Sequence, residues 1–323
     1  MSKFELGEED KSLPLSPEML RRRKRREPTA ELPEALRPPP EPPRQPNEVR
    51  RVDRSRRAAT DVVRQTQGYC PPWAGVAYAP KRMRVPAPPR IMHRGRQLRP
   101  RVDFAPAGDQ QFYDDPGTFP WRCVCRITNA FGRVGSGVLV GPRHILTASH
   151  CVAWSSSDSE MIEVHRAGTV TQAVAFNTAA LAYTQIEGDS ASSDVLDEDY
   201  AVLVTNERLG DRFGWLGARE YDSGWDGDTF WSTMGYPASS VSPVFQQSQW
   251  LDEDALDFGS GRAMTTSADL LPGQSGSPMF ATWDDGPYVV AVMSSDDPPE
   301  NENWCAGGSD LPSLVQFARD NHP

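Results

Sequence analysis

The chain has 323 residues, of which 38% are hydrophobic, and its formal net charge is −10 at pH 7. No run approaches the roughly 18 consecutive apolar residues of a membrane-spanning helix, and residues 1–30 lack the apolar core of a secretory signal. The composition excludes a protein anchored by apolar helices, so we expect no membrane partner.

Charge divides the chain into two parts. Residues 1–107 hold 24 Lys and Arg against 13 Asp and Glu, whereas residues 108–323 hold 10 against 31. The first part is rich in proline, as in Pro38–Pro40, and has too few large apolar residues to offset its chain entropy. We therefore predict a basic, largely disordered arm over 1–107 and a folded domain over 108–323. Within the arm, the aromatic stretch Tyr69–Tyr78 is the part expected to dock.

Three roles are open for this arm. As a propeptide, it would be drawn by its positive charge onto the acidic domain and would cover the cleft of that domain. As a targeting segment, it would use the basic cluster Arg21–Arg26 as a localisation signal or a cleavage site. As a nucleic-acid-binding segment, it would neutralise phosphates. The opposite charges favour the propeptide and an intramolecular contact with the domain, and nucleic acid is not an expected partner.

Several short runs in the domain are rich in β-branched and aromatic residues and are separated by Gly, Pro, Asp and Ser, which is typical of strands. These runs are Val138–Val140, Ile145–Leu146, Val170–Phe176, Tyr200–Val204 and Tyr288–Met293. Near the end, apolar residues at helical spacing predict a closing helix. They are Leu311, Leu314, Val315 and Ala318.

Three motifs in the domain indicate nucleophilic catalysis. Leu-Thr-Ala-Ser-His-Cys at 146–151 presents His150, an acidic run ends in Asp199 at the mouth of a strand, and Pro-Gly-Gln-Ser-Gly-Ser-Pro at 272–278 sets Ser275 among glycines. A serine hydroxyl is a poor nucleophile until a neighbouring base takes its proton. A carboxylate must orient that base and stabilise the imidazolium ion. We predict Ser275 as nucleophile, His150 as general base and acid, and Asp199 as the orienting carboxylate.

Each of these motifs alone also occurs in ordinary turns and surface loops. The acidic run offers Asp194, Asp197 and Glu198 as rivals, and we prefer Asp199 because the apolar strand follows it directly. The glycines around Ser275 permit a tight turn, so the N–H groups of Gly273 and Ser275 are predicted to form an oxyanion hole.

Together the motifs resemble the chymotrypsin-fold serine proteases, in particular their V8-like, glutamyl endopeptidase branch. The resemblance covers residues 119–320 and rests on the glycine-rich segment 135–148, on Gly-Tyr-Pro at 235–237, and on the order His, Asp, Ser. It implies an all-β fold of two packed antiparallel six-stranded barrels, a site in the cleft between them and a short C-terminal helix.

The resemblance leaves the preferred P1 residue open. Glutamyl specificity in this branch relies on a histidine in the strand that lines the primary pocket, and Met293 stands there instead. Ser294 matches the position whose hydroxyl supports the catalytic aspartate. Asp269 has the spacing at which trypsin-like enzymes place the acid that binds Arg or Lys, although it also fits an ordinary turn. Gln274 replaces the acid that pairs with a new amino terminus in trypsin-like zymogens.

The cysteines allow several pairings. Cys151 follows the histidine as it does in disulfide-bonded relatives, but their usual partner position, near Gly135, has no cysteine. Cys123 and Cys125, on one face of a strand, are the candidate partners, and Cys305 has only Cys70 as an evident one. The odd number leaves at least one thiol unpaired. No spacing makes a zinc site, so we expect neither a metal nor an organic cofactor.

The function predicted from the sequence is a serine endopeptidase that cleaves protein or peptide substrates through an acyl-enzyme. Two alternatives remain, namely an inactive protease-fold binding module and an esterase that uses the same triad. We expect a secreted protein, because the proteases it resembles are mostly secreted and its domain is acidic and free of lysine.

Overall fold

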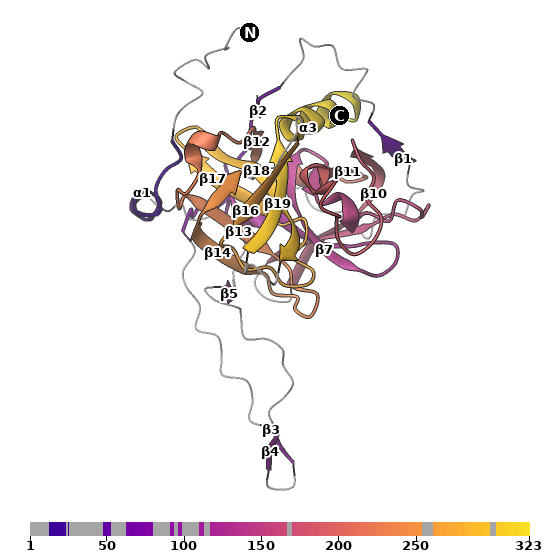
Figure 1. Ribbon diagram of the computed structural model, residues 1–323, viewed down its shortest axis with the longest axis horizontal. Coiled ribbons are helices and arrows are strands. Elements are labelled where there is room, and N and C mark those ends of the chain that lie inside the picture. Colours follow the sequence, from indigo (N-terminus) through magenta and orange to yellow (C-terminus); the bar gives the residue numbers. More distant parts are fainter. Residues whose placement is uncertain are drawn as a thin grey trace.

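A computed structural model describes residues 13–23, 25, 48–52, 63–79, 91–93, 96–98, 110–112, 117–166, 170–253, 261–297 and 302–323. Most of the predicted arm, including its proline-rich stretch, lies outside these residues. Two sheets lie side by side, and the C-terminal helix packs across one end of both (Figure 1).

The first sheet is a closed six-stranded barrel. Its strands follow one another in the ring as β10, β11, β8, β7, β6 and β9, and β9 pairs back onto β10. Every contact within this ring is antiparallel. The strands are β6 (Val124–Thr128), β7 (Val134–Gly141), β8 (His144–Thr147), β9 (Met161–Arg166), β10 (Val170–Ala182) and β11 (Ala201–Thr205). A further strand, β1 (Glu48–Arg51), adds to β10 in parallel.

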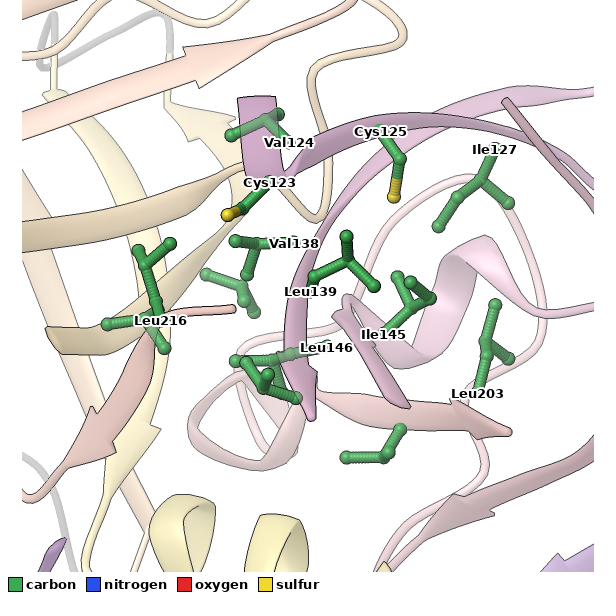
Figure 2. Packing of buried hydrophobic residues seen from close by; sticks show 14 of the residues in the cluster. Cys123, Val124, Cys125, Ile127, Val138, Leu139, Ile145, Leu146, Leu203 and Leu216 are labelled. Atoms are coloured by element: carbon green, nitrogen blue, oxygen red, sulfur yellow. The ribbon is translucent and has the colours of Figure 1, made fainter. Parts of the chain in front are cut away.

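The barrel interior is filled largely by aliphatic side chains. Leu139, Ile145 and Leu203 are fully buried and point toward one another from β7, β8 and β11, whereas Val138 lies on the opposite side of β7 (Figure 2). Branched side chains pack well on a pleated surface and favour strands. Burial of such a cluster supplies the main driving force for closing the barrel.

The second sheet is a half-barrel. Its order is β15-β16-β19-β18-β17-β13-β14-β5, and β12 adds to β18. Trp250 alone separates β14 from β15, so the chain is nearly continuous between two strands that lie far apart in this order. The strands are β5 (Gln111–Phe112), β12 (Gly217–Arg219), β13 (Trp231–Gly235), β14 (Val244–Gln249), β15 (Leu251–Glu253), β16 (Gly261–Thr266), β17 (Pro278–Trp283), β18 (Gly286–Asp297) and β19 (Glu302–Gly308).

In the part of the chain that the structure describes, three α-helices accompany the sheets. They are α1 (Pro17–Arg22), α2 (Leu209–Phe213) and α3 (Asp310–Asn321). The predicted apolar face of α3 is fully buried, and α3 packs on β8 and β11 of the first sheet and on β12 and β19 of the second. Among the described residues, no helix is both long enough and apolar enough to cross a bilayer.

Three described segments upstream of residue 107 pack on the domain, and one of them contains β1, which pairs with β10. In the segment 63–79, β2 (Gln65–Thr66) pairs with β12, and the Tyr69 ring lies 4.7 Å from that of Trp215. The aromatic stretch therefore contacts the domain at Trp215. Farther upstream, the N–H of Leu15 donates to Thr282 O at 2.7 Å, and Arg23 pairs with Asp284. A separate hairpin of β3 (Ile91–His93) and β4 (Arg96–Leu98) pairs with neither sheet among the described residues.

The all-β class and the short C-terminal helix are confirmed, and each predicted strand run lies within or overlaps an observed strand. The two sheets differ in closure, since the first is a complete barrel and the second is a half-barrel.

Candidate active site

His150 lies in a short turn that the first barrel anchors at several points. The turn Ser149–Cys151 follows β8 directly, and β8 is fixed to β7 where Thr147 Oγ1 donates to Ser136 O at 2.7 Å. Ser149 Oγ donates to Thr184 O at 2.7 Å, and Trp154 Nε1 donates to Ser149 O at 2.9 Å. The imidazole is thereby held at the edge of the barrel with only 5% of its surface exposed.

Asp199 is fully buried and uses both carboxylate oxygens on its neighbours. Its Oδ1 accepts the backbone N–H of His150 at 2.9 Å, and its Oδ2 lies 2.7 Å from His150 Nδ1. Ser294 Oγ donates to the same Oδ2 at 2.5 Å. These contacts fix the imidazole so that Nδ1 faces the carboxylate and Nε2 points away from it.

The rival acids of the same run are placed elsewhere. Asp194 is exposed and accepts a hydrogen bond from Ser192, and Glu198 accepts one from Thr184. Among the acids of this run that the structure describes, Asp199 is the one that hydrogen-bonds to His150. The strand β11 therefore presents Asp199 as the partner of the imidazole.

The electrostatics of this pair favour an ion pair. Burial lowers the pKa of His150, but Cys151 and Asp199 beside it stabilise the imidazolium and bring its pKa well above the ordinary value. Burial raises the pKa of Asp199, whereas the imidazolium charge and the hydrogen bonds from His150 and Ser294 outweigh it, so the net shift is downward. The carboxylate stays charged while the imidazole takes up and releases a proton.

Ser275 lies in a turn that depends on glycine. Gly273 and Gly276 have φ values of 96° and 82°, a region that residues with a side chain rarely adopt. The turn is tied to both sheets, because Ser136 N donates to Ser275 O at 2.8 Å and Gly276 N donates to Met293 O at 2.7 Å. The sequence-predicted nucleophile is thus held between the two sheets.

The hydroxyl of Ser275 donates to Ser294 O at 3.4 Å. No hydrogen bond joins Ser275 Oγ to His150 Nε2 among the described residues, and Nε2 lies 3.9 Å from Cys151 Sγ. Cys151 Sγ also lies 3.5 Å from Ser275 O, so His150 and Ser275 share a neighbour. Hydrogen bonds between catalytic groups are often long without substrate and tighten in the complex.

The two predicted oxyanion donors have no acceptor among the described residues. Neither the N–H of Gly273 nor that of Ser275 is engaged in a backbone hydrogen bond. Ser136 Oγ donates to Gly273 O at 2.9 Å and accepts from Tyr236 N at 2.8 Å. Ser136, whose role the sequence did not reveal, thereby fixes the orientation of the peptide plane that follows Gly273.

The three residues predicted for the substrate pocket make different contacts. Ser294 touches Asp199, as described above. Met293 is 1% exposed and its Sδ lies 3.4 Å from Cys305 Sγ, within the core of the second sheet. Asp269 is half-buried, and its backbone N–H and C=O are both hydrogen-bonded to the side chain of Gln246 at 2.8 Å.

All five cysteines are free thiols in the structure, so none of the disulfides considered from the sequence is formed. Cys305 lies in the core of the second sheet, whereas Cys123 and Cys125 lie in the core that includes the first barrel. Cys151 touches the candidate catalytic groups instead of another thiol. The expected disulfide at Cys151 took no account of the sheet to which each cysteine belongs.

A hollow of about 230 Å³ lies at another part of the second sheet. It is bordered by β2, β12 and the start of α3, with Arg219, Tyr221 and Trp225 among its walls. None of the predicted site residues lines it, so it is not the pocket of this site.

Comparison with known proteins supports the same assignment. Residues 135–292 match the family described as the trypsin-like peptidase domain, and this range contains His150, Asp199 and Ser275. This part, just under half of the chain, resembles a trypsin-like peptidase domain. Its resemblance to the glutamyl endopeptidase branch of the chymotrypsin-fold serine proteases, predicted from the motifs, is confirmed.

The peptidase domain has curated relatives of modest identity. It is 26% identical over 188 residues to the glutamyl endopeptidase of Bacillus licheniformis, with 55% of this chain and 56% of the relative covered. It is 25% identical over 192 residues to a Bacillus subtilis protein named extracellular metalloprotease, with 55% and 58% covered. The chain therefore spans little more than half the length of these relatives.

The solved structure of a Glu endopeptidase in complex with MPD has the same fold. It superposes on the chain with a TM-score of 0.54 at 18% identity, covering 66% of this chain and 97% of that one.

Proposed function

We propose that the chain is a serine endopeptidase in which Ser275, His150 and Asp199 act as a catalytic triad. The observation that carries the proposal is the buried Asp199 carboxylate, which binds both the backbone and the ring of His150 and accepts from Ser294. An aspartate in a solvated loop, or a histidine that serves only in packing, is not expected to make three such contacts. The glycine turn that holds Ser275 between the two sheets supplies the nucleophile.

The geometry supports the following acyl transfer. When substrate enters, a rotation of the Ser275 side chain brings Oγ to His150 Nε2, which takes its proton as Oγ attacks the peptide carbonyl carbon. The Asp199 carboxylate stabilises the imidazolium, and the N–H groups of Gly273 and Ser275 stabilise the oxyanion. The imidazolium then protonates the leaving amine, and a water molecule activated by His150 hydrolyses the acyl-enzyme.

The substrate class we propose is protein or peptide, with a P1 residue other than glutamate. A carboxylate in the primary pocket needs a positive charge or several donors, and Met293 offers only a buried thioether. Asp269 makes a basic P1 residue the alternative to test, since a desolvated carboxylate favours a guanidinium.

We also propose secretion, with the basic arm acting as a propeptide. One relative is named an extracellular protease, and the arm and the domain carry opposite charges. Arg23, which pairs with Asp284 of the domain at 2.9 Å, is a contact of the expected sign.

The test is mass spectrometry of a diverse peptide mixture incubated with the full chain, with Ser275→Ala and with His150→Ala. We expect cleavage by the wild type that both variants abolish, and the new termini give the P1 residue. Cleavage retained in Ser275→Ala would refute the triad. Hydrolysis confined to ester probes would replace the endopeptidase with an esterase.

A further inference from the structure

Three glutamines that are distant in the sequence meet beneath the turn that carries Ser275. Gln110, Gln246 and Gln274 are 3%, 1% and 2% exposed. Gln110 lies beside β5, Gln246 lies in β14, and Gln274 directly precedes Ser275. Buried amides are costly unless their donors and acceptors are engaged, so such a cluster indicates a specific role.

The cluster holds the segment that leads into the turn 273–276, which carries Ser275 and is named the oxyanion turn below. Gln246 binds both backbone groups of Asp269, and Gln110 Nε2 donates to the same Asp269 O at 2.9 Å. Gln110 Nε2 also lies 3.1 Å from Gln274 Oε1, which accepts the N–H of Leu271 at 2.7 Å. The loop 269–274 is therefore fixed at Asp269, Leu271 and Gln274; it contains the predicted oxyanion donor Gly273 and immediately precedes the other, Ser275.

Gln110 acts in this cluster as a donor. Its Oε1 accepts no hydrogen bond from the described residues, whereas its Nε2 meets two acceptors that face it. A carboxylate at this position has no donor to offer while it is ionised, and two oxygens would then repel it. The amide is thus the group that satisfies both oxygens without a buried charge.

The backbone explains how Gln110, which directly precedes β5 at the edge of the second sheet, reaches the loop 269–274. β5 adds to the edge of β14 with Phe112 opposite Val244 and Gln111 opposite Phe245. Continuing that antiparallel register brings Gln110 beside Gln246. Thirteen residues separate Gln110 from the first strand of the closed barrel, β6, which begins at Val124.

We propose that Gln110 is a positioning residue that orders the oxyanion turn, and that the active enzyme must retain the short segment 110–112. The inference rests on the proposed peptidase function. In this proposal, the hydrogen bonds of the three neutral glutamine side chains order the loop before Ser275. Any maturation cleavage must then occur upstream of Gln110.

The first test compares Gln110→Ala with the matched control Gln111→Ala in the full chain. No hydrogen bond joins Gln111 to the loop 269–274 among the described residues, so the control keeps the strand and removes the same side chain. We expect faster hydrogen–deuterium exchange over 270–275 in Gln110→Ala only, with kcat lowered roughly ten- to hundredfold and KM changed much less.

The second test uses pH to separate positioning from general stability. Burial raises the pKa of a carboxyl group, so Gln110→Glu is protonated at low pH and can then donate one hydrogen bond. We expect the ratio of kcat in Gln110→Glu to kcat in the wild type to fall as pH rises. A variant that is only less stable would show no such trend while it remains folded, as monitored by circular dichroism.

Equal exchange in the two alanine variants, or equal kcat, would overturn the role of Gln110 and leave the peptidase assignment intact. The exchange measurement does not depend on catalysis. A wild type without hydrolysis would therefore remove the proposed function, while the exchange of 270–275 would still decide whether Gln110 orders the loop.

Discussion

The closed barrel and the half-barrel differ in what they bury and in what they contribute to the site. The first barrel has a mainly aliphatic interior, and it supplies His150 and Asp199, which are joined by short, buried hydrogen bonds. The core of the second sheet is aromatic and sulfur-rich, with the rings of Trp225 and Trp283 at 5.4 Å. This sheet supplies Ser275 on a glycine turn held by neutral amides.

This difference indicates that the two sheets have different roles in the candidate site. Burial opposes ionisation of the carboxylate, which stays charged because His150 and Ser294 are held against it. The closed barrel provides the rigid edge that keeps His150 in this place. The nucleophile turn must accommodate substrate and two unpaired N–H groups. It lies on the more open sheet and takes its order from polar side chains, including one from outside both barrels.

The largest effect is expected at the charged pair. Asp199→Asn keeps the shape but replaces the acceptor that fixes the tautomer of His150, so kcat should fall by about 10⁴-fold. Steady-state kinetics on a cleaved peptide would measure this. Asp194→Asn removes an exposed acid of the same run and serves as the control that should keep wild-type rates.

The two cores can be compared by truncation. Leu203→Ala and Met264→Ala each remove a side chain that is 0% exposed, and each should lower the free energy of unfolding by about 2–5 kcal/mol. We expect the larger loss for Leu203→Ala, because a closed ring of strands relaxes less around a cavity. Urea denaturation measures both, and Met264→Leu, at under about 1.5 kcal/mol, is the control. A larger loss at Met264 would reverse the comparison.

Ser294 connects the two sheets, since it lies on β18 and donates to Asp199. A hydrogen bond to a charged group contributes roughly 1.5–3 kcal/mol, so Ser294→Ala should lower kcat about ten- to hundredfold with little change in KM. Ser295→Ala alters the neighbouring serine and should leave kcat unchanged. If Ser294→Ala kept full activity, the second sheet would not support the charged pair.

The smallest effect is a shift in titration. The pKa of His150 is raised by Cys151 and Asp199 against the opposing effect of burial, and the base is active only when neutral. The rate should therefore fall as pH decreases through a midpoint above 6.5. NMR titration of the imidazole in Ser275→Ala measures that pKa, and Asp199→Asn should move it downward. A midpoint below 6.5 in the presence of Asp199 would contradict the proposed ion pair.

The sequence by itself determined the class of the fold and the candidate catalytic side chains. Short β-branched runs and the apolar face of α3 follow local periodicity, which burial on one face imposes on any strand or helix. His150, Asp199 and Ser275 each stand beside such a run, so their neighbourhood could be predicted from adjacent residues.

Only the tertiary structure decided which distant polar groups meet. It joined Ser294 to Asp199 and placed Ser136 under Gly273. It also left the cysteines unpaired and gathered Gln110, Gln246 and Gln274 beneath one loop. Glutamine has no positional pattern of its own, and a side-chain hydrogen bond between residues 164 positions apart leaves no local trace in the chain. Such contacts arise from the register in which strands add to a sheet, and that register is set by the packing of the whole core.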